Sequence, residues 1–373
     1  MYMKHRMYVL IILALVPVTQ VFSQGNDSCS NTIKELQARI EKLEKSQKSL
    51  VSVSGQIFGS YSYSTFGTNG KEYNKFDLDR SYITVRGSIA DRWSMQLTTD
   101  LYRGADTNTY YKGFGVRMKF AYLEYSPDKW SWRFGLIPGP FHSVEELAWK
   151  YRGVAQTGTD RYGYFATADL GISGSYKLPS GYGELGAGVY NGKGYTSPET
   201  DKYKDIAFRA SLNPFPSHQL LRSLMVAGFT TIGYENGKKY SGLPKNRYGV
   251  LGYYSYSIAS IGIEYGTRTD APTHPDTTKT GSFTSVFGEV QSPWNSLDAF
   301  SIIWRYDFVD PNTSNDNDGY DFAVVGITYK PNKRITFVAD YQGTVAETKN
   351  LKTTAGGYVD YDARYFIHMI VSL

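Results

Sequence analysis

Apolar and polar residues alternate with a period of two along most of the chain after residue 51. Successive side chains of a β-strand point to opposite faces, so this pattern predicts strands with one apolar and one polar face. One segment places Phe300, Ile302, Trp304, Tyr306 and Phe308 opposite Arg305 and Asp307. The predicted strands have roughly 9–14 residues, whereas strands of soluble proteins usually have about 5–6. Long alternating strands are typical of barrels that cross an outer membrane.

The pattern predicts sixteen strands. Their spans are 51–64, 78–89, 92–102, 117–126, 130–136, 168–177, 182–190, 204–213, 223–234, 247–256, 259–267, 283–291, 299–308, 320–330, 334–342 and 358–372. Short connections such as Ala90–Asp91 and Pro331–Lys333 alternate with long polar stretches such as 103–116 and 268–282. Outer-membrane barrels have short turns at one end, long loops at the other and, in bacterial single chains, an even strand number. We therefore predict an all-β fold, a 16-stranded antiparallel transmembrane β-barrel over residues 51–373, wide enough to hold water.

The N-terminal residues show the pattern of an export signal. Two basic residues, Lys4 and Arg6, precede the apolar run Tyr8–Val18, and Ser23 is a small residue before Gln24. This order of charge, apolar core and small residue is that of a secretory signal peptide, which we assign to residues 1–23. The alternative is a retained anchor, although the apolar run is short for a bilayer span.

A short heptad repeat follows the export signal. The apolar residues of this repeat are Ile33, Leu36, Ile40, Leu43 and Leu50. This spacing predicts a coiled-coil helix in the segment 24–50, which we place in the periplasm. A repeat of fewer than three heptads is marginal alone, so it requires several copies held close together. The alternative is a single surface helix.

Composition narrows the possible functions. The mean hydropathy of −0.39 is too polar for a bundle of membrane helices, yet aromatic residues reach 16%. The formal net charge of +5 includes no basic block suited to nucleic acid, so we expect no nucleic-acid partner. The single cysteine, Cys29, excludes an internal disulfide and a cysteine-based metal site. We expect no metal and no cofactor.

The polar faces of the predicted strands would line the barrel interior. We assign as pore-lining the basic residues Arg80, Arg86, Lys119, Arg133, Arg209, Arg305 and Arg364. Acidic residues are about as numerous on these faces, but most lie near strand ends, whereas several arginines lie near mid-strand. A charge in the narrow part of a channel acts more strongly on passing ions than a charge at a wide, solvent-filled entrance, where screening is strong. We therefore predict a weak anion preference; the alternative is ordinary hydrophilicity with charges paired across strands.

The longest connection, residues 137–167, is a candidate constriction loop. Its charged residues are Glu145, Glu146, Lys150, Arg152, Asp160 and Arg161. In a barrel this wide, an over-long loop can fold into the interior, and charges of both signs across a constriction would set a size limit and a transverse field. The alternative is a surface loop with solvated charges.

Several local sequences resemble those of a known family. These are Trp132–Phe141, Trp149–Arg152, Asp169–Gly174 and Val189–Gly192. With the export signal, the coiled coil and the strand count, they resemble the phosphate-selective porin O and P family in the form found in Bacteroidetes and Chlorobi. The resemblance implies a homotrimer of water-filled channels in the Gram-negative outer membrane, in contact with its lipid. No phosphate-binding cluster of basic residues carries over to this sequence.

The sequence therefore favours a porin for passive diffusion of small hydrophilic solutes, with a weak preference for anions; phosphate is one candidate. Two alternatives remain: a barrel that acts as a structural anchor or adhesin, and a barrel enzyme. Neither a Gly-x-Ser-x-Gly elbow nor a His-Glu-x-x-His helix occurs. We expect no enzymatic activity.

Overall fold

The computed structural model describes residues 34–37, 39, 51–65, 72–103, 113–237, 239–271, 274, 277–348, 351–352 and 358–373. The chain forms two compact units, Met1–Val51 and Ser52–Leu373. In the first unit the described residues 34–37 and 39 are helical. The predicted signal peptide, Cys29 and most of the heptad repeat lie outside the described residues. No helix in the described part of the chain has the length and apolar composition needed to cross a bilayer.

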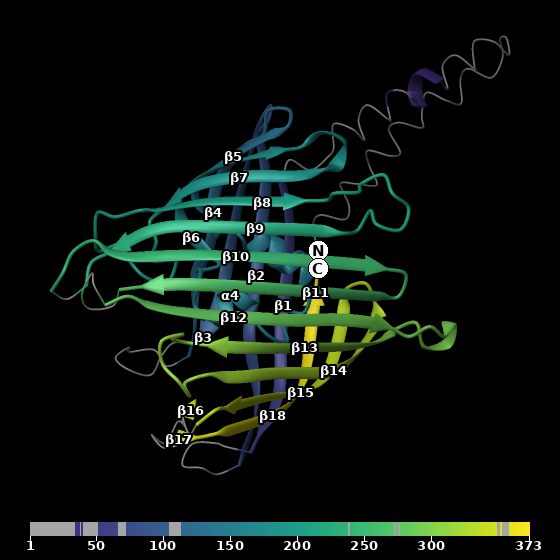
Figure 1. Ribbon diagram of the computed structural model, residues 1–373. Helices are drawn as coiled ribbons and strands as arrows, with labels where there is room; N and C mark the ends of the chain where they lie inside the picture. The colour runs from purple at the N-terminus through teal and green to yellow at the C-terminus, as the bar shows by residue number, and fades with distance from the viewer. Residues whose placement is uncertain are drawn as a thin grey trace, which may run out of the picture. The chain divides into compact units, whose positions relative to one another are not determined.

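Sixteen antiparallel strands close into one barrel, which confirms the predicted fold class (Figure 1). The strands are β1 (Val51–Ser64), β2 (Tyr73–Ala90), β3 (Trp93–Arg103), β4 (Phe114–Tyr125), β5 (Trp130–Pro138), β6 (Ala168–Lys177), β7 (Gly183–Tyr190), β8 (Asp205–Leu212), β9 (Met225–Glu235), β10 (Leu243–Tyr256), β11 (Ala259–Asp270), β12 (Lys279–Gln291), β13 (Phe300–Asp310), β14 (Tyr320–Asn332), β15 (Ile335–Ala346) and β18 (Tyr361–Ser372). Neighbours in sequence pair with each other, and β18 pairs with both β15 and β1.

The two rims of the barrel differ. Short turns such as Asp91–Arg92 and Ser257–Ile258 lie at one end, which we call the turn rim; the connection 213–224 is its longest. The other end, the loop rim, carries the long connections and a small hairpin of β16 (Leu351–Lys352) and β17 (Tyr358–Val359). Several strands run further toward the loop rim than the alternation predicted, because polar and aromatic residues continue the ladder beyond the apolar stretch. Strand β2, for example, begins at Tyr73 rather than at residue 78.

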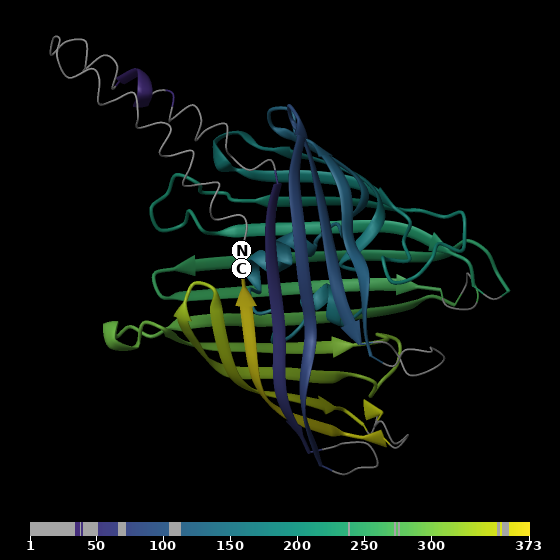
Figure 2. The same cartoon turned by 180° about the vertical axis from the view of Figure 1, so that it is seen from behind.

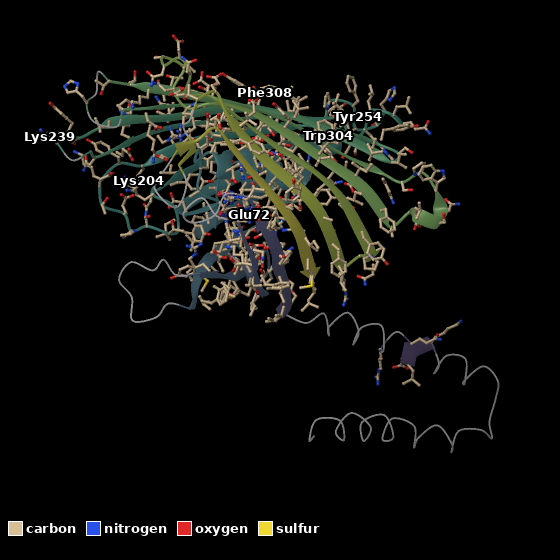
Figure 3. All side chains as sticks on the ribbon, turned by 90° about the horizontal axis from the view of Figure 1, so that it is seen from below. Glu72, Lys204, Lys239, Tyr254, Trp304 and Phe308 are labelled. Atoms are coloured by element: carbon tan, nitrogen blue, oxygen red, sulfur yellow. The ribbon has the colours of Figure 1, made fainter. Side chains whose placement is uncertain are left out.

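The outward face of the barrel is apolar, as the alternation predicted. Ile302, Phe308 and Ile367 are between 53% and 55% exposed, whereas most of their strand neighbours point inward and are buried. Aromatic rings pair near the turn rim, with Trp93 stacked on Tyr125 at 4.7 Å and Trp130 against Tyr176 at 4.8 Å. An apolar band edged by aromatic residues suits a lipid environment. Figure 3 shows side chains on both faces of the wall.

The connection between β5 and β6, residues 139–167, lies inside the barrel, and we call it the inner loop (Figures 1 and 2). It contains two short helices, α3 (His142–Ala148) and α4 (Gly158–Arg161). Many of its side chains are almost fully buried, among them Phe141 at 0% exposure and Trp149 at 3%. Such burial in a connecting segment is unusual, because loops ordinarily run over the protein surface.

Candidate functional site: the channel interior

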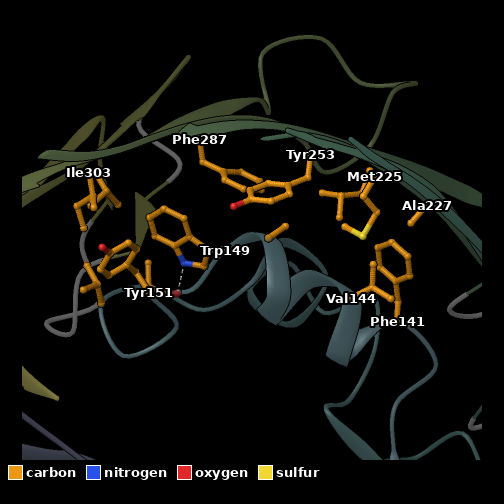
Figure 4. Close-up of a cluster of buried hydrophobic side chains, with 14 of the residues drawn as sticks. Phe141, Val144, Trp149, Tyr151, Met225, Ala227, Tyr253, Phe287 and Ile303 are labelled. Atoms are coloured by element: carbon orange, nitrogen blue, oxygen red, sulfur yellow. Dashed lines mark hydrogen bonds between the residues drawn. The ribbon is translucent and has the colours of Figure 1, made fainter. Parts of the chain in front are cut away.

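Apolar side chains hold the inner loop against one side of the barrel. Phe141 of the loop contacts Phe229 of β9, with ring centroids 4.6 Å apart. Trp149 of the loop contacts Phe287 of β12, with ring centroids 5.6 Å apart (Figure 4). The strands β9–β15, which we call the docked wall, supply the remaining partners. These are Met225, Ala227, Leu251, Tyr253, Ile303, Phe322, Val324 and Val338, all buried. Burial of two large aromatic side chains favours docking by about 1.5–3 kcal/mol each.

An ion pair on β13 adds polar anchors to this apolar contact. Arg305 Nη2 lies 2.7 Å from Asp307 Oδ2, and both side chains are at most 1% exposed. Arg305 Nη1 donates to the Gln156 carbonyl oxygen at 2.6 Å, and the Tyr162 hydroxyl donates to Asp307 at 2.5 Å. Each charge of the buried pair therefore also binds the inner loop. This matters because a buried charge is stable only when paired and hydrogen-bonded.

Further anchors lie at both ends of the docked segment. Toward the turn rim, the Tyr151 hydroxyl donates to Glu289 at 2.5 Å and accepts from Lys330 Nζ at 2.8 Å. Toward the loop rim, Arg247 Nε donates to the Tyr164 carbonyl oxygen at 3.1 Å. The inner loop is thus fixed along its length rather than at one point.

A pair of carboxyl groups is buried between the loop and β11. Glu145 is 2% exposed, and its carboxylate accepts hydrogen bonds from the backbone nitrogen and the hydroxyl of Thr159 at 2.8 and 2.5 Å. The carboxyl group of Glu264, which is 3% exposed, lies beside it. Burial raises the pKa of Glu145, because a low-dielectric environment disfavours the charged form.

The inner loop narrows the lumen and leaves a cavity on each side of it. A cavity of about 480 Å³ lies toward the turn rim and one of about 300 Å³ toward the loop rim. Phe58, Arg152 and Gly153 line both. A Cβ placed on Gly153 would lie 2.8 Å from Ile370 Cδ1, so the loop backbone reaches the opposite side of the barrel. That side consists of β18 and β1–β4, and we call it the open wall.

Basic side chains dominate the two cavities. The basic residues that line them are Lys75, Arg80, Arg86, Lys119, Lys150, Arg152, Arg161, Lys330 and Arg364. Among the described lining residues, Glu146 and Asp79 are the only acids. Clefts lined by one sign of charge with low-dielectric walls concentrate counter-ions. This excess was not visible in the sequence count, where acids and bases on the polar faces nearly balanced.

Tyr82 of β2 is the point where cations from three elements converge. Arg80 of β2 and Arg152 of the inner loop donate to its hydroxyl at 3.2 and 3.1 Å. Lys119 Nζ of β4 lies 4.4 Å from the centroid of its ring. Glu146 and Asp160 lie 3.3 and 3.2 Å from Arg152 and neutralise part of this charge. The narrow zone therefore has positive charge on both the open wall and the loop.

The structure distributes the sequence-predicted residues over several environments. Four of the predicted pore-lining residues line the two cavities: Arg80, Arg86, Lys119 and Arg364. Two others line a separate groove along β5–β8, where Arg133 pairs with Glu124 and Arg209 pairs with Glu184. Arg305 lies behind the loop as an anchor. Four of the predicted loop residues line a cavity: Glu146, Lys150, Arg152 and Arg161. The guanidinium carbon of Arg161 also lies 3.5 Å from the ring centroid of Phe322. Asp160 pairs with Arg152, and Glu145 faces β11.

Two features of the site escaped the sequence reading. The docked wall is apolar on its inner face as well as its outer face, and runs such as Phe322–Ile327 carry that signal. The second feature is a β-bulge in β4, where Thr98 pairs with Phe120 and Thr99 with Met118. Lys119 is the extra residue, and as a result both Lys119 and Phe120 line the larger cavity.

Comparisons with known proteins identify the fold. No protein-family model matches the chain, and no curated protein matches it in sequence. Solved structures do match. The anion-selective porin from Comamonas acidovorans aligns with a TM-score of 0.66 and 10% identity, covering 87% of this chain and 99% of that one.

Two further structures of the same architecture are similar. The trimer form of OmpT, an outer membrane protein of Vibrio cholerae, aligns at a TM-score of 0.61 and 13% identity over 87% of this chain and 99% of that one. OprB of Pseudomonas putida aligns at 0.61 and 8% identity over 90% and 96%. At these identities the likeness establishes a shared fold, that of outer-membrane β-barrels. Within the described residues no group of three or more His, Cys, Asp or Glu side chains is placed to hold a metal.

Proposed function

We propose that this protein is a porin through which small hydrophilic solutes diffuse passively. One observation carries the proposal: the inner loop narrows a closed sixteen-stranded barrel without filling it. Cavities of about 480 and 300 Å³ remain on its two sides, and most of the residues that line them are polar or charged. A barrel of this width suits an aqueous channel, and an inward-folded loop suits a size limit.

The channel prefers anions. This part of the proposal rests on the excess of basic side chains over Glu146 and Asp79 along both cavities. One structural neighbour is an anion-selective porin, which supports this part of the proposal. Phosphate is one candidate solute, because the local sequences resemble the phosphate-selective porin O and P family. Without a matching cluster of basic residues, phosphate remains one anion to be tested among several.

The remaining parts of the proposal concern location and assembly. The protein is exported by the signal peptide 1–23, resides in the Gram-negative outer membrane in contact with its lipid, and forms homotrimers with the segment 24–50 as a periplasmic coiled coil. The apolar outward face supports the membrane location, and the trimer form of a structural neighbour supports the assembly. We propose no enzymatic activity, no cofactor and no nucleic-acid partner.

Recordings from purified protein in planar lipid bilayers test the channel and its selectivity. Stepwise conductance is expected in potassium chloride, and under a salt gradient the reversal potential should show chloride crossing more readily than potassium. Lys150→Glu, at an exposed position lining the larger cavity, should weaken this preference. Lys204→Glu, which changes an exposed residue that pairs with Glu199, is the matched control and should leave it unchanged.

Two results would contradict the proposal in different ways. Absence of conductance steps in protein that has folded would favour a structural anchor or adhesin. Steps with a clear preference for potassium would leave the porin intact and exclude the anion preference.

A further inference from the structure

We infer that the larger cavity is a binding site for small organic carboxylates whose body is an apolar ring. The inference rests on the proposed channel function, because it names a solute class for the same lumen. It starts from Lys119, which is 3% exposed although it carries an ammonium group. No carboxylate oxygen in the described ranges lies within 4.0 Å of its Nζ atom.

The contacts of Lys119 leave its hydrogen-bond donors free. Its Nζ atom lies 4.4 Å from the ring centroid of Tyr82 and 5.0 Å from that of Phe120. These cation–π contacts favour the charge without using an N–H group as an ordinary hydrogen bond would. A buried charge normally has a hydrogen-bonded partner. Here the partner is missing among the described residues, and the side chain lines a cavity of about 480 Å³.

The β-bulge explains why a cation and a ring face this cavity together. In a regular strand, consecutive residues point to opposite faces, so one of Lys119 and Phe120 would face lipid. The bulge turns both inward, which costs regular pairing at that point. Phe120 is only partly buried, so its ring remains accessible.

The rest of the cavity repeats this combination of charge and apolar surface. Phe58 and Ile370 of the open wall provide apolar contacts. Arg86 provides a second cation, and its side chain, unlike that of Lys119, is exposed. The neighbouring amide of Gln96 is already engaged: its side-chain oxygen accepts from Arg86 Nε at 2.8 Å and from the Tyr122 hydroxyl at 2.9 Å. A ligand that uses the free donors and the rings is an anion with an apolar body. A carboxylate on a ring fits this requirement better than a small, fully hydrated inorganic anion.

Ligand-observed saturation-transfer NMR on the detergent-solubilised full chain tests the site independently of conductance. Benzoate, which carries a ring, is compared with acetate, which does not, and with inorganic phosphate. We expect benzoate to bind with a Kd about tenfold lower than acetate, through ring packing on Phe120 and the open wall. We expect phosphate to bind no more tightly than acetate.

Three variants connect this preference to the residues. Lys119→Met keeps the length of the side chain and should raise the Kd for benzoate about tenfold or more, because hydrogen bonds to a charged group are lost. Phe120→Leu keeps an apolar side chain and should reduce the ratio of benzoate to acetate affinity while leaving acetate unchanged. Arg364→Met removes an exposed cation in the other cavity and should alter neither affinity.

Equal affinities for benzoate and acetate in the wild-type protein would overturn the inference. So would a Kd for benzoate that stays unchanged in Lys119→Met. Partial misfolding cannot imitate an unchanged Kd, because misfolded protein would bind benzoate more weakly. A protein that binds benzoate as expected but conducts no ions would refute the porin proposal and leave the binding site standing.

Discussion

The two sides of the lumen differ in polarity: the docked wall is apolar, whereas the open wall is charged. The docked wall presents Phe229, Phe287 and Val338 to the inner loop, and these side chains are buried with little or no water contact. The open wall presents Tyr82, Arg86 and Lys119 to cavities. An inner loop that bound equally to both sides would close the barrel. An apolar contact on one side and a charged surface on the other leave the two cavities along the open wall.

In the proposed channel, different residues would govern ion selectivity and loop position. Charges that face the cavities would influence which ions enter, whereas charges behind the loop, such as Arg305 and Asp307, fix where the loop lies.

The largest effect is expected from removal of the apolar contact. The double variant Phe141→Ala/Trp149→Ala should cost the docked loop about 3–5 kcal/mol per site. Because the strands themselves are unchanged, we expect the barrel to form while the loop leaves the docked wall. Single-channel conductance should then rise severalfold.

Leu147→Ala is the matched control, since Leu147 lies on the same helix, α3, but is 57% exposed. Its conductance should equal that of the wild type. An unchanged conductance in the double variant would show that docking does not depend on the apolar cluster.

The same comparison explains what the sequence could reveal. Lipid favours apolar residues at outward positions, so alternation located all sixteen strands. The lumen imposes no such rule. Val338 lies between Thr336 and Asp340 on an inward face and is fully buried because it contacts a loop far away in sequence. Contacts of that kind leave no periodic signal.

Local signals did exist for the bulge. Outward apolar positions in β4 are even-numbered at Val116 and Met118 and odd-numbered at Ala121 and Leu123. A shift of parity within one strand predicts an inserted residue. Glu145 and Glu146 offered no such cue: consecutive residues of a helix point about 100° apart, so one faces β11 and the other a cavity.

A second effect, smaller on conductance, is expected from the buried ion pair. Asp307→Ala leaves Arg305 buried without its carboxylate and removes the acceptor of the Tyr162 hydroxyl. Loss of one partner of a buried pair costs about 3–5 kcal/mol. We expect a lower unfolding temperature of the detergent-solubilised barrel, measured by circular dichroism.

The chain contains a matched pair for comparison. Asp362 and Arg364 are also two residues apart on one strand and lie 2.8 Å apart, but their side chains are 21% and 48% exposed. Exposed pairs contribute about 0–1 kcal/mol, so Asp362→Ala should leave the unfolding temperature nearly unchanged. Equal shifts in the two variants would mean that burial does not distinguish the pairs.

The smallest effect concerns pH. Burial holds the pKa of Glu145 above its usual range, so the docked loop binds a proton more tightly than an undocked loop does. Docking is therefore favoured at low pH and weakens as pH rises through the raised pKa. The nearby charges are those of Glu264, Asp160, Arg305 and Asp307. Hydrogen–deuterium exchange in residues 154–162, corrected for intrinsic rates, should be faster at alkaline than at acidic pH.

Glu145→Gln separates this cause from others, because an amide cannot ionise but can still accept a hydrogen bond from Thr159. Exchange in this variant should depend less on pH, and exchange in the double variant Glu145→Gln/Glu264→Gln, which removes the second buried carboxyl group, should lose its dependence on pH. Glu146→Gln changes a neighbouring carboxylate that faces the cavity and should keep the dependence. If the pH dependence persists in the double variant, the two buried carboxyl groups do not control docking, and the inner loop is held by its apolar contacts, the Arg305–Asp307 pair and the anchors at its two ends.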